Sequence, residues 1–159
     1  KSLAVATPEM VMWSYVGLST GDLLSGLLSQ LFKSRKRVIY LNLMGIAVMT
    51  LVYLYGPVGS QNYYRTIAFL LGAVTGYWAI FVTNASEQFG TNIRMTVTTT
   101  VPNFVRGALI PISLLFKFLI PSMGLIHAAT WVGVLCFSLA LFAISQLKDT
   151  FGKSLDFVE

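Results

Sequence analysis

Two charged side chains that could do chemistry stand in the middle of long apolar stretches. Asp22 lies ten residues before Phe32, where the first stretch ends, and Arg106 lies fourteen residues before Ile120. A charge at the centre of a membrane helix costs about 2.5–3.5 kcal/mol on insertion scales, so such residues usually face a polar cavity or a partner. We predict that both face a hydrated passage between helices. There Arg106 would pair with Asp22, bind an anionic substrate group, or pair with a residue outside this chain.

Asp22 is the predicted proton-coupling residue, with a purely structural role as the alternative. A carboxylate that alternates between a dry pocket and contact with a guanidinium group takes up and releases a proton as its surroundings change. The same stretch has polar residues at helical spacing from Asp22, and small residues at every fourth position that allow close helix packing. These are Ser19, Gly26 and Gln30, and Gly17, Gly21, Ser25 and Ser29.

Asn103 and Arg106 belong to the segment VPNFVRGALIP, which contains two prolines. Pro102 and Pro111 each remove a backbone hydrogen bond, and Gly107 loosens the helix between them. We therefore expect a broken helix at mid-depth, whose freed carbonyl groups need a water-filled or protein-lined cavity. Asn103 and Arg106 are predicted proton-coupling or substrate residues of that cavity.

Tyr77 and Trp78 are two further candidates, in the segment GAVTGYWAIFVTN. Aromatic rings that face a cavity can stack on a ring or sugar face of a solute. Such rings equally fill a surface that faces lipid. Both interpretations of Tyr77 and Trp78 stay open from the sequence.

The composition indicates lipid as the main solvent. Of the 159 residues, 55% are hydrophobic and 11% charged, with a mean hydropathy of +0.73, whereas a soluble domain carries roughly 25% charged residues. The net charge is +5, but its one dense basic run lies between apolar stretches without interleaved aromatics, which argues against nucleic-acid binding. With one histidine and one cysteine, the chain alone assembles neither a metal site nor a nucleophile with its base. We expect no enzyme, metal or cofactor.

Five apolar stretches can cross a hydrocarbon layer about 30 Å thick at 1.5 Å per residue. The predicted fold is therefore an all-α integral membrane protein with about five transmembrane helices. Their expected bounds are 9–32, 38–55, 63–83, 95–120 and 125–147, and residues 148–159 form a tail.

Basic residues predict the direction of these spans. The loop from Lys33 to Arg37 carries four cations, whereas the next loop, from Gly56 to Asn62, carries none. Because Lys and Arg in short loops are retained on the cytoplasmic side, the first span begins outside and the tail lies in the cytoplasm. We expect the bacterial inner membrane, and a longer polypeptide with at least one earlier helix.

Two predicted cytoplasmic loops carry a family resemblance. The residues G-x-x-x-Q-L-x-K-x-R-K, from Gly26 to Lys36, resemble the loop motif G-x-x-x-D-R-x-G-x-R-R of the major facilitator superfamily. Gln30, Leu31 and Lys33 replace the acid, the arginine and the glycine of that motif. The segment ASEQFGTNIRMTVTTTVPNFVRG resembles the loop between the tenth and eleventh helices of that family, where an acid ends one helix and an arginine opens the next.

The resemblance implies helices eight to twelve of a twelve-helix transporter, most of one six-helix half. Its partners would be a small organic solute, protons, the lipid bilayer and the missing N-terminal half. A cytoplasmic gate would tie helix ends together, or else form a solvated loop that sets topology; it comprises Gln30, Arg35, Lys36, Glu87 and Arg94. Proton-coupled secondary transport is the expected function, as uptake or efflux. The alternative is a non-transporting membrane scaffold or receptor-like protein.

Overall fold

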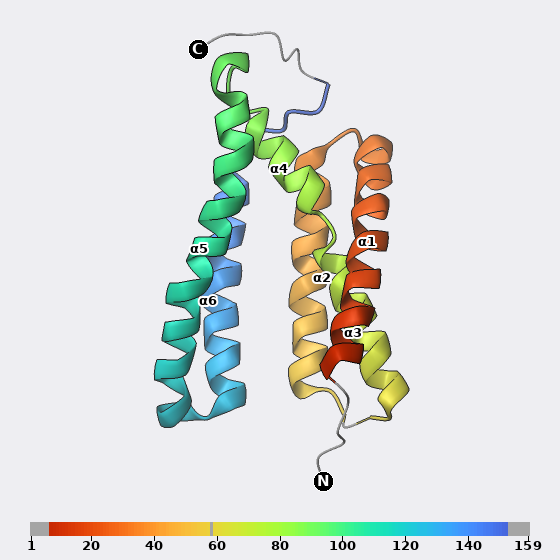
Figure 1. Cartoon of the computed structure of the whole chain (residues 1–159), viewed down its shortest axis with the longest axis vertical. Helices are drawn as coiled ribbons and strands as arrows, with labels where there is room; N and C mark the ends of the chain where they lie inside the picture. The colour runs from red at the N-terminus through yellow and green to blue at the C-terminus, as the bar shows by residue number, and fades with distance from the viewer. Residues whose placement is uncertain (1–6, 58, 153–159) are drawn as a thin grey trace. The chain divides into compact units, whose positions relative to one another are not determined.

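All regular structure in the described part of the chain is helical, as the composition predicted. The computed structural model describes residues 7–57 and 59–152, and no strand occurs there. Six helices follow one another along the chain (Figure 1). They are α1 (Thr7–Phe32), α2 (Arg35–Tyr55), α3 (Gln61–Thr75), α4 (Trp78–Ser86), α5 (Thr91–Met123) and α6 (Leu125–Gln146).

Four segments of the described residues are long and apolar enough to cross a membrane. They are Arg35–Tyr55, Gln61–Ser86, Thr91–Met123 and Leu125–Gln146. Helix α1, the first of the five predicted spans, has 26 residues but is not among these four. Asp22 and the Ser, Thr and Gly residues around it lower the mean hydropathy of α1.

The chain divides into two compact units, Lys1–Phe81 and Val82–Glu159. The first unit contains α1, α2, α3 and the start of α4, and α1 packs against α3 along most of its length. Gly17 and Gly21 of α1 lie against the backbone of Phe69 and Ala73 in α3, so closely that a Cβ atom at either glycine would overlap these atoms. Small residues let the two helix backbones approach in this way.

Helix α2 begins earlier than predicted, and this corrects the extent of the basic loop. Arg35, Lys36 and Arg37 form its first turn, after Ser34 as N-cap, whose Oγ accepts a hydrogen bond from the Arg37 N–H at 3.2 Å. Cations at the positive end of a helix dipole are unfavourable by about 0.3–1 kcal/mol. Helix stability therefore does not account for this basic cluster. Its role in setting the membrane topology stays a prediction.

The predicted span 63–83 is interrupted. Helix α3 ends at Thr75 and α4 begins at Trp78, with Gly76 as the C-cap of α3. The Tyr77 N–H donates to the Thr75 carbonyl at 2.9 Å, and the Tyr77 carbonyl accepts from the Phe81 N–H, which starts the next helix.

The expected break at the prolines of VPNFVRGALIP was wrong. Helix α5 runs without interruption for 33 residues and contains Pro102, Pro111 and Pro121, whereas the sequence predicted a span of 95–120 that Pro121 would stop. An apolar solvent offers no alternative partners for backbone groups, so an intact helix is favoured over an open one. The helix ends at Gly124, whose φ of 79° favours glycine and whose N–H donates to the Ile120 carbonyl at 2.8 Å.

The second unit is an antiparallel pair of α5 and α6 joined at Gly124, with the end of α4 before it (Figure 1). Helix α6 covers Leu125–Gln146, against the predicted 125–147. It buries Ala128, Val132 and Ile144, while α5 has no buried residue. Most apolar side chains of this pair are therefore turned outward.

Candidate functional site at a helix break

The interruption between α3 and α4 is surrounded by polar groups from all helices of the first unit. We call this set the break cluster: Asp22 and Ser25 of α1, Asn42 of α2, and the backbone from Gly76 to Ala79. The break follows the 15 residues of α3 within an apolar segment of 26 residues. Free backbone groups at such a depth cost several kcal/mol each unless other groups bond them.

A chain of hydrogen bonds satisfies the end of α3. The Ser25 hydroxyl, which is 2% exposed, donates to the Gly76 carbonyl at 2.6 Å. The Asn42 side-chain amide donates to Ser25 Oγ at 3.2 Å and to the carbonyl of Val38 in its own helix at 2.9 Å. Three helices are thus joined at one carbonyl group that the break sets free.

Asp22 lies at the beginning of α4. The Ala79 N–H donates to Asp22 Oδ1 at 3.5 Å, a long hydrogen bond. The first N–H groups of a helix lack partners within it, and its N-terminus carries partial positive charge. The half-buried carboxylate of Asp22 therefore acts as an N-cap supplied by a neighbouring helix. Its other oxygen has no hydrogen-bond partner in the described part of the chain.

Glycines allow this arrangement by their lack of a side chain. Gly76 has a φ of −74°, which any residue can adopt, so its backbone conformation does not require glycine. A Cβ atom there would lie 2.5 Å from the Asp22 backbone nitrogen and 2.6 Å from the carbonyl carbon of Gly21. Gly76 is needed because α1 passes directly against the break.

Tyr77 and Trp78, predicted as substrate contacts, are part of the break itself. Tyr77 is the second of the two residues between the helices, after Gly76, and its side chain is half-buried. Trp78 is the first residue of α4, 37% exposed, and its ring lies 5.8 Å from that of Phe81 at an interplanar angle of 45°. Both residues therefore belong to the backbone segment of the break cluster.

Arg106 and Asn103 lie in α5, in the second unit. Both side chains are exposed. The Asn103 amide donates to the Thr99 carbonyl of its own helix at 3.1 Å, and Arg106 makes no hydrogen bond or ion pair with a described residue of its unit. Because Asp22 belongs to the first unit, its expected pairing with Arg106 stays a prediction.

The five predicted gate residues lie at helix ends of both units. Gln30 is exposed near the end of α1, and Arg35 and Lys36 are half-buried in the first turn of α2. Glu87 follows α4 and is 7% exposed, and Arg94 is half-buried in the first turn of α5. A latch that joins all five across the two units stays a prediction.

Within the second unit, Glu87 has a contact that the sequence did not suggest. The Thr150 hydroxyl lies 2.7 Å from Glu87 Oε2 and 2.9 Å from Asn84 Oδ1. All three side chains are buried. The Gln88 amide also donates to the Lys148 carbonyl at 2.8 Å. The start of the tail is thereby bound to the loop after α4.

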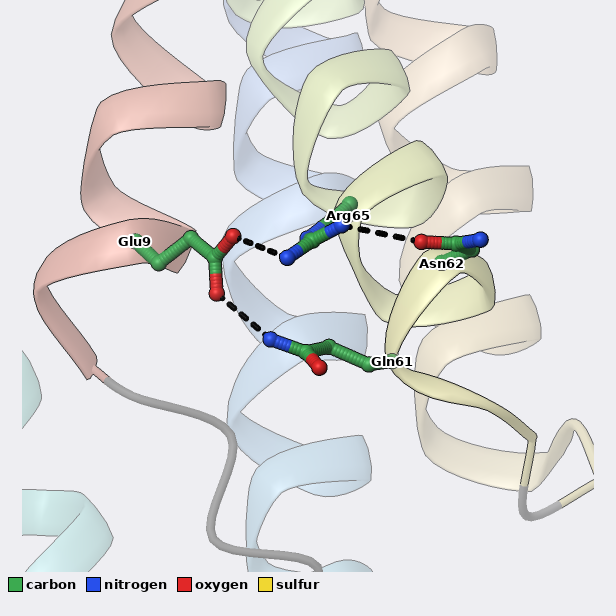
Figure 2. A network of polar contacts seen from close by, with 4 residues as sticks. All are labelled: Glu9, Gln61, Asn62 and Arg65. Atoms are coloured by element: carbon green, nitrogen blue, oxygen red, sulfur yellow. Dashed lines mark hydrogen bonds and ion pairs between the residues drawn. The ribbon is translucent and has the colours of Figure 1, made fainter.

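A second polar network joins the beginnings of α1 and α3 in the first unit (Figure 2). Glu9 Oε1 forms an ion pair with Arg65 Nη2 at 2.5 Å, and Glu9 Oε2 accepts a hydrogen bond from Gln61 at 2.8 Å. Arg65 Nη1 donates to Asn62 Oδ1 at 2.9 Å. Sequence reasoning did not indicate this ion pair, because Glu9 and Arg65 are remote from each other in the chain.

Comparison with known proteins gives no assignment for this site. No family model, no curated protein and no solved structure matches the chain. Across residues 7–57 and 59–152, no group of three or more His, Cys, Asp or Glu side chains is placed to hold a metal ion. The side chains of the break cluster comprise the Asp22 carboxylate, the Ser25 hydroxyl, the Asn42 amide, the Tyr77 phenol and the Trp78 indole.

Proposed function

We propose that this chain is part of a secondary active transporter, of the major facilitator type, that moves a small organic solute by alternating access. The observation that carries the proposal is the interrupted helix with polar side chains gathered around it. Substrate and ion sites of secondary transporters often lie near the bilayer midplane, where helices are discontinuous and half-helix termini point at the ligand. Two features of the first unit support the proposal: the helix is discontinuous at Gly76, and the Asp22 carboxylate lies at the N-terminus of α4.

Asp22 is the proposed proton carrier of this transporter. Its carboxylate has one long hydrogen bond to Ala79 and a second oxygen without a partner among the described residues, so it has capacity for a proton or a polar group of the solute. Tyr77 and Trp78 would supply apolar surface for the body of the solute. Arg106, from the second unit, is the proposed counter-ion or anion-binding group.

Thiol labelling tests alternating access without knowledge of the solute. In the full-length protein with every native cysteine replaced by serine, Cys136 included, Ala79→Cys puts a small thiol at the break and keeps the backbone N–H. We expect a membrane-impermeant methanethiosulfonate reagent to label it in right-side-out and in inside-out vesicles. The controls Ser60→Cys, before α3, and Gln146→Cys, at the end of α6, should each be labelled in one vesicle type only.

Asp22→Asn then tests the proton in the Ala79→Cys background. Asparagine keeps an oxygen that can accept the Ala79 hydrogen bond, but it cannot bind a proton. An imposed pH gradient should change the ratio of outside to inside labelling with Asp22 and leave it unchanged with asparagine. An equal response of both proteins would remove Asp22 from the coupling mechanism. Labelling of Ala79→Cys from one side or from neither would contradict alternating access and favour the scaffold or receptor-like alternative.

A further inference from the structure

A pocket of about 370 Å³ lies between α1 and α3, beside the Glu9–Arg65 network and apart from the break cluster. This volume is within the range of about 300–1,000 Å³ typical of small-molecule sites. Its lining consists of Trp13, Asn62, Arg65, Thr66 and Phe69. All five residues belong to the first unit, so the pocket does not depend on the placement of the second.

Two buried N–H groups of this lining have no hydrogen-bond partner in the described part of the chain. They are Trp13 Nε1 and Arg65 Nε. A buried donor without a partner costs about 1–3 kcal/mol, and buried polar groups of folded proteins are nearly always bonded. Two such donors on side chains that line the same pocket indicate a ligand that accepts hydrogen bonds.

The contacts of Arg65 leave it able to bond an anionic acceptor as well as Glu9. Only Nη2 of the guanidinium group meets Glu9, and both oxygens of that carboxylate are already engaged, by Arg65 and by Gln61. Nη1 is held by Asn62 Oδ1, which leaves the Asn62 amide hydrogens as further donors. Thr66 gives its hydroxyl hydrogen to the Asn62 carbonyl at 3.0 Å. The pocket therefore offers donors and a fixed guanidinium group, which match the oxygens of a carboxylate or phosphate.

The remaining wall of the pocket is apolar. Phe69 and the indole ring of Trp13 give it two aromatic surfaces. We propose that this pocket binds an organic anion whose carboxylate or phosphate bonds Arg65, Trp13 and Asn62 and whose apolar body lies on the two rings. The anion is either a free aromatic carboxylate or the headgroup of an anionic lipid. This site is separate from the proposed transport site and does not rest on it.

Trp13 itself can report the binding. In the full-length protein with every tryptophan except Trp13 replaced by phenylalanine, Trp78 and Trp131 among them, Trp13 fluorescence is titrated with benzoate in neutral detergent micelles, and with benzyl alcohol as the uncharged control. The same protein is placed in nanodiscs of phosphatidylcholine with and without phosphatidylglycerol. We expect saturable quenching or a spectral shift by benzoate, at least tenfold weaker for benzyl alcohol.

Arg65→Lys is the matched variant because lysine keeps the positive charge next to Glu9 but removes the Nε donor. Benzoate should bind it at least tenfold more weakly, while the thermal unfolding midpoint and circular dichroism stay close to those of the parent. A response to phosphatidylglycerol alone, lost in Arg65→Lys, would identify a lipid headgroup as the anion. Equal binding of benzoate and benzyl alcohol, an unchanged affinity in Arg65→Lys, or no response to either anion would overturn the proposal.

Discussion

The α1–α3 pair and the α5–α6 pair are both apolar, yet they are held in different ways. Gly17 and Gly21 of α1 lie against the backbone of α3, and Gly72 of α3 lies against the backbone of Ser14. In α5 and α6, a Cβ atom added at Gly107 or Gly133 would meet no atom within 4 Å. The large apolar side chains there that are more than half exposed include Leu109, Leu114, Phe118, Leu139 and Phe142.

The difference shows that hydropathy alone does not tell which helices pack closely. Lipid tails are as apolar as leucine, so helices in a bilayer associate through close backbone approach and polar bonds. The α1–α3 pair has both, whereas the α5–α6 pair has an outward apolar surface suited to lipid or to further helices. Helix α1 has a lower hydropathy than the four candidate spans. It nevertheless packs more closely against a neighbouring helix than α5 or α6 does.

The two regions also treat helix-breaking residues differently. Three prolines leave α5 continuous, but Gly76 ends α3. The side chains of Thr98, Thr99 and Asn103 bond carbonyl groups of α5 itself. At Gly76, Ser25 and Asp22 come from another helix to bond the freed backbone groups. A break inside an apolar segment thus depends on a partner more than on the breaking residue.

The largest expected effect distinguishes glycines that lie against a neighbouring helix from glycines with open space around them. Gly21→Ala puts a methyl group into the backbone of Ala73, and overpacking typically costs about 1–3 kcal/mol, with a backbone clash at the upper end. Gly133→Ala meets open space and should leave stability unchanged or raise it by about 0.5–1 kcal/mol. Unfolding of both variants by dodecyl sulfate, followed by circular dichroism, measures the two changes. Similar losses in both would contradict the contrast between the helix pairs.

The sequence predicted what depends on local hydropathy. The end of α2 at Tyr55 and the bounds of α6 follow from apolar runs that charges and glycine limit. Asp22 was predicted as a site residue from its position within an apolar stretch, and the structure shows that it lies at the start of α4. The position of the break was not predicted, because the hydrogen bonds that Ser25 and Asp22 make to the backbone around Gly76 are a property of the packed helices.

The partners of Asp22 could be predicted only in part. Ser25 was recognised as a small packing residue, but its bond to Gly76 joins residues 51 positions apart. Asn42 carried a usable signal, since an amide within an apolar run needs a partner, although nothing local indicates that this partner is Ser25. The Glu9–Arg65 pair likewise requires the antiparallel course of the chain to bring two helix beginnings together.

An intermediate loss of stability is expected when the hydrogen bond between Ser25 and the Gly76 carbonyl is removed. Ser25→Ala removes the hydroxyl that donates to the Gly76 carbonyl and leaves a buried acceptor, at a cost of about 1–2 kcal/mol. Ser138→Ala, on the exposed side of α6, is the matched control and should change stability by less than about 0.5 kcal/mol. The same unfolding measurement applies. A Ser25→Ala protein as stable as the control would show that the break does not need this hydrogen bond.

The smallest effect, of opposite sign, is expected in α5. Pro111 is exposed in a helix that stays continuous, so Pro111→Ala restores a backbone hydrogen bond to the Gly107 carbonyl without filling occupied space. Stability should rise by up to about 1 kcal/mol, less than the roughly 3 kcal/mol of a soluble helix, because transmembrane helices partly accommodate proline. Gly107→Ala, one turn earlier, should add a similar increment through helix propensity alone. A loss of more than about 1 kcal/mol in Pro111→Ala would mean that α5 needs its proline for packing, and the contrast with the break at Gly76 would then fail.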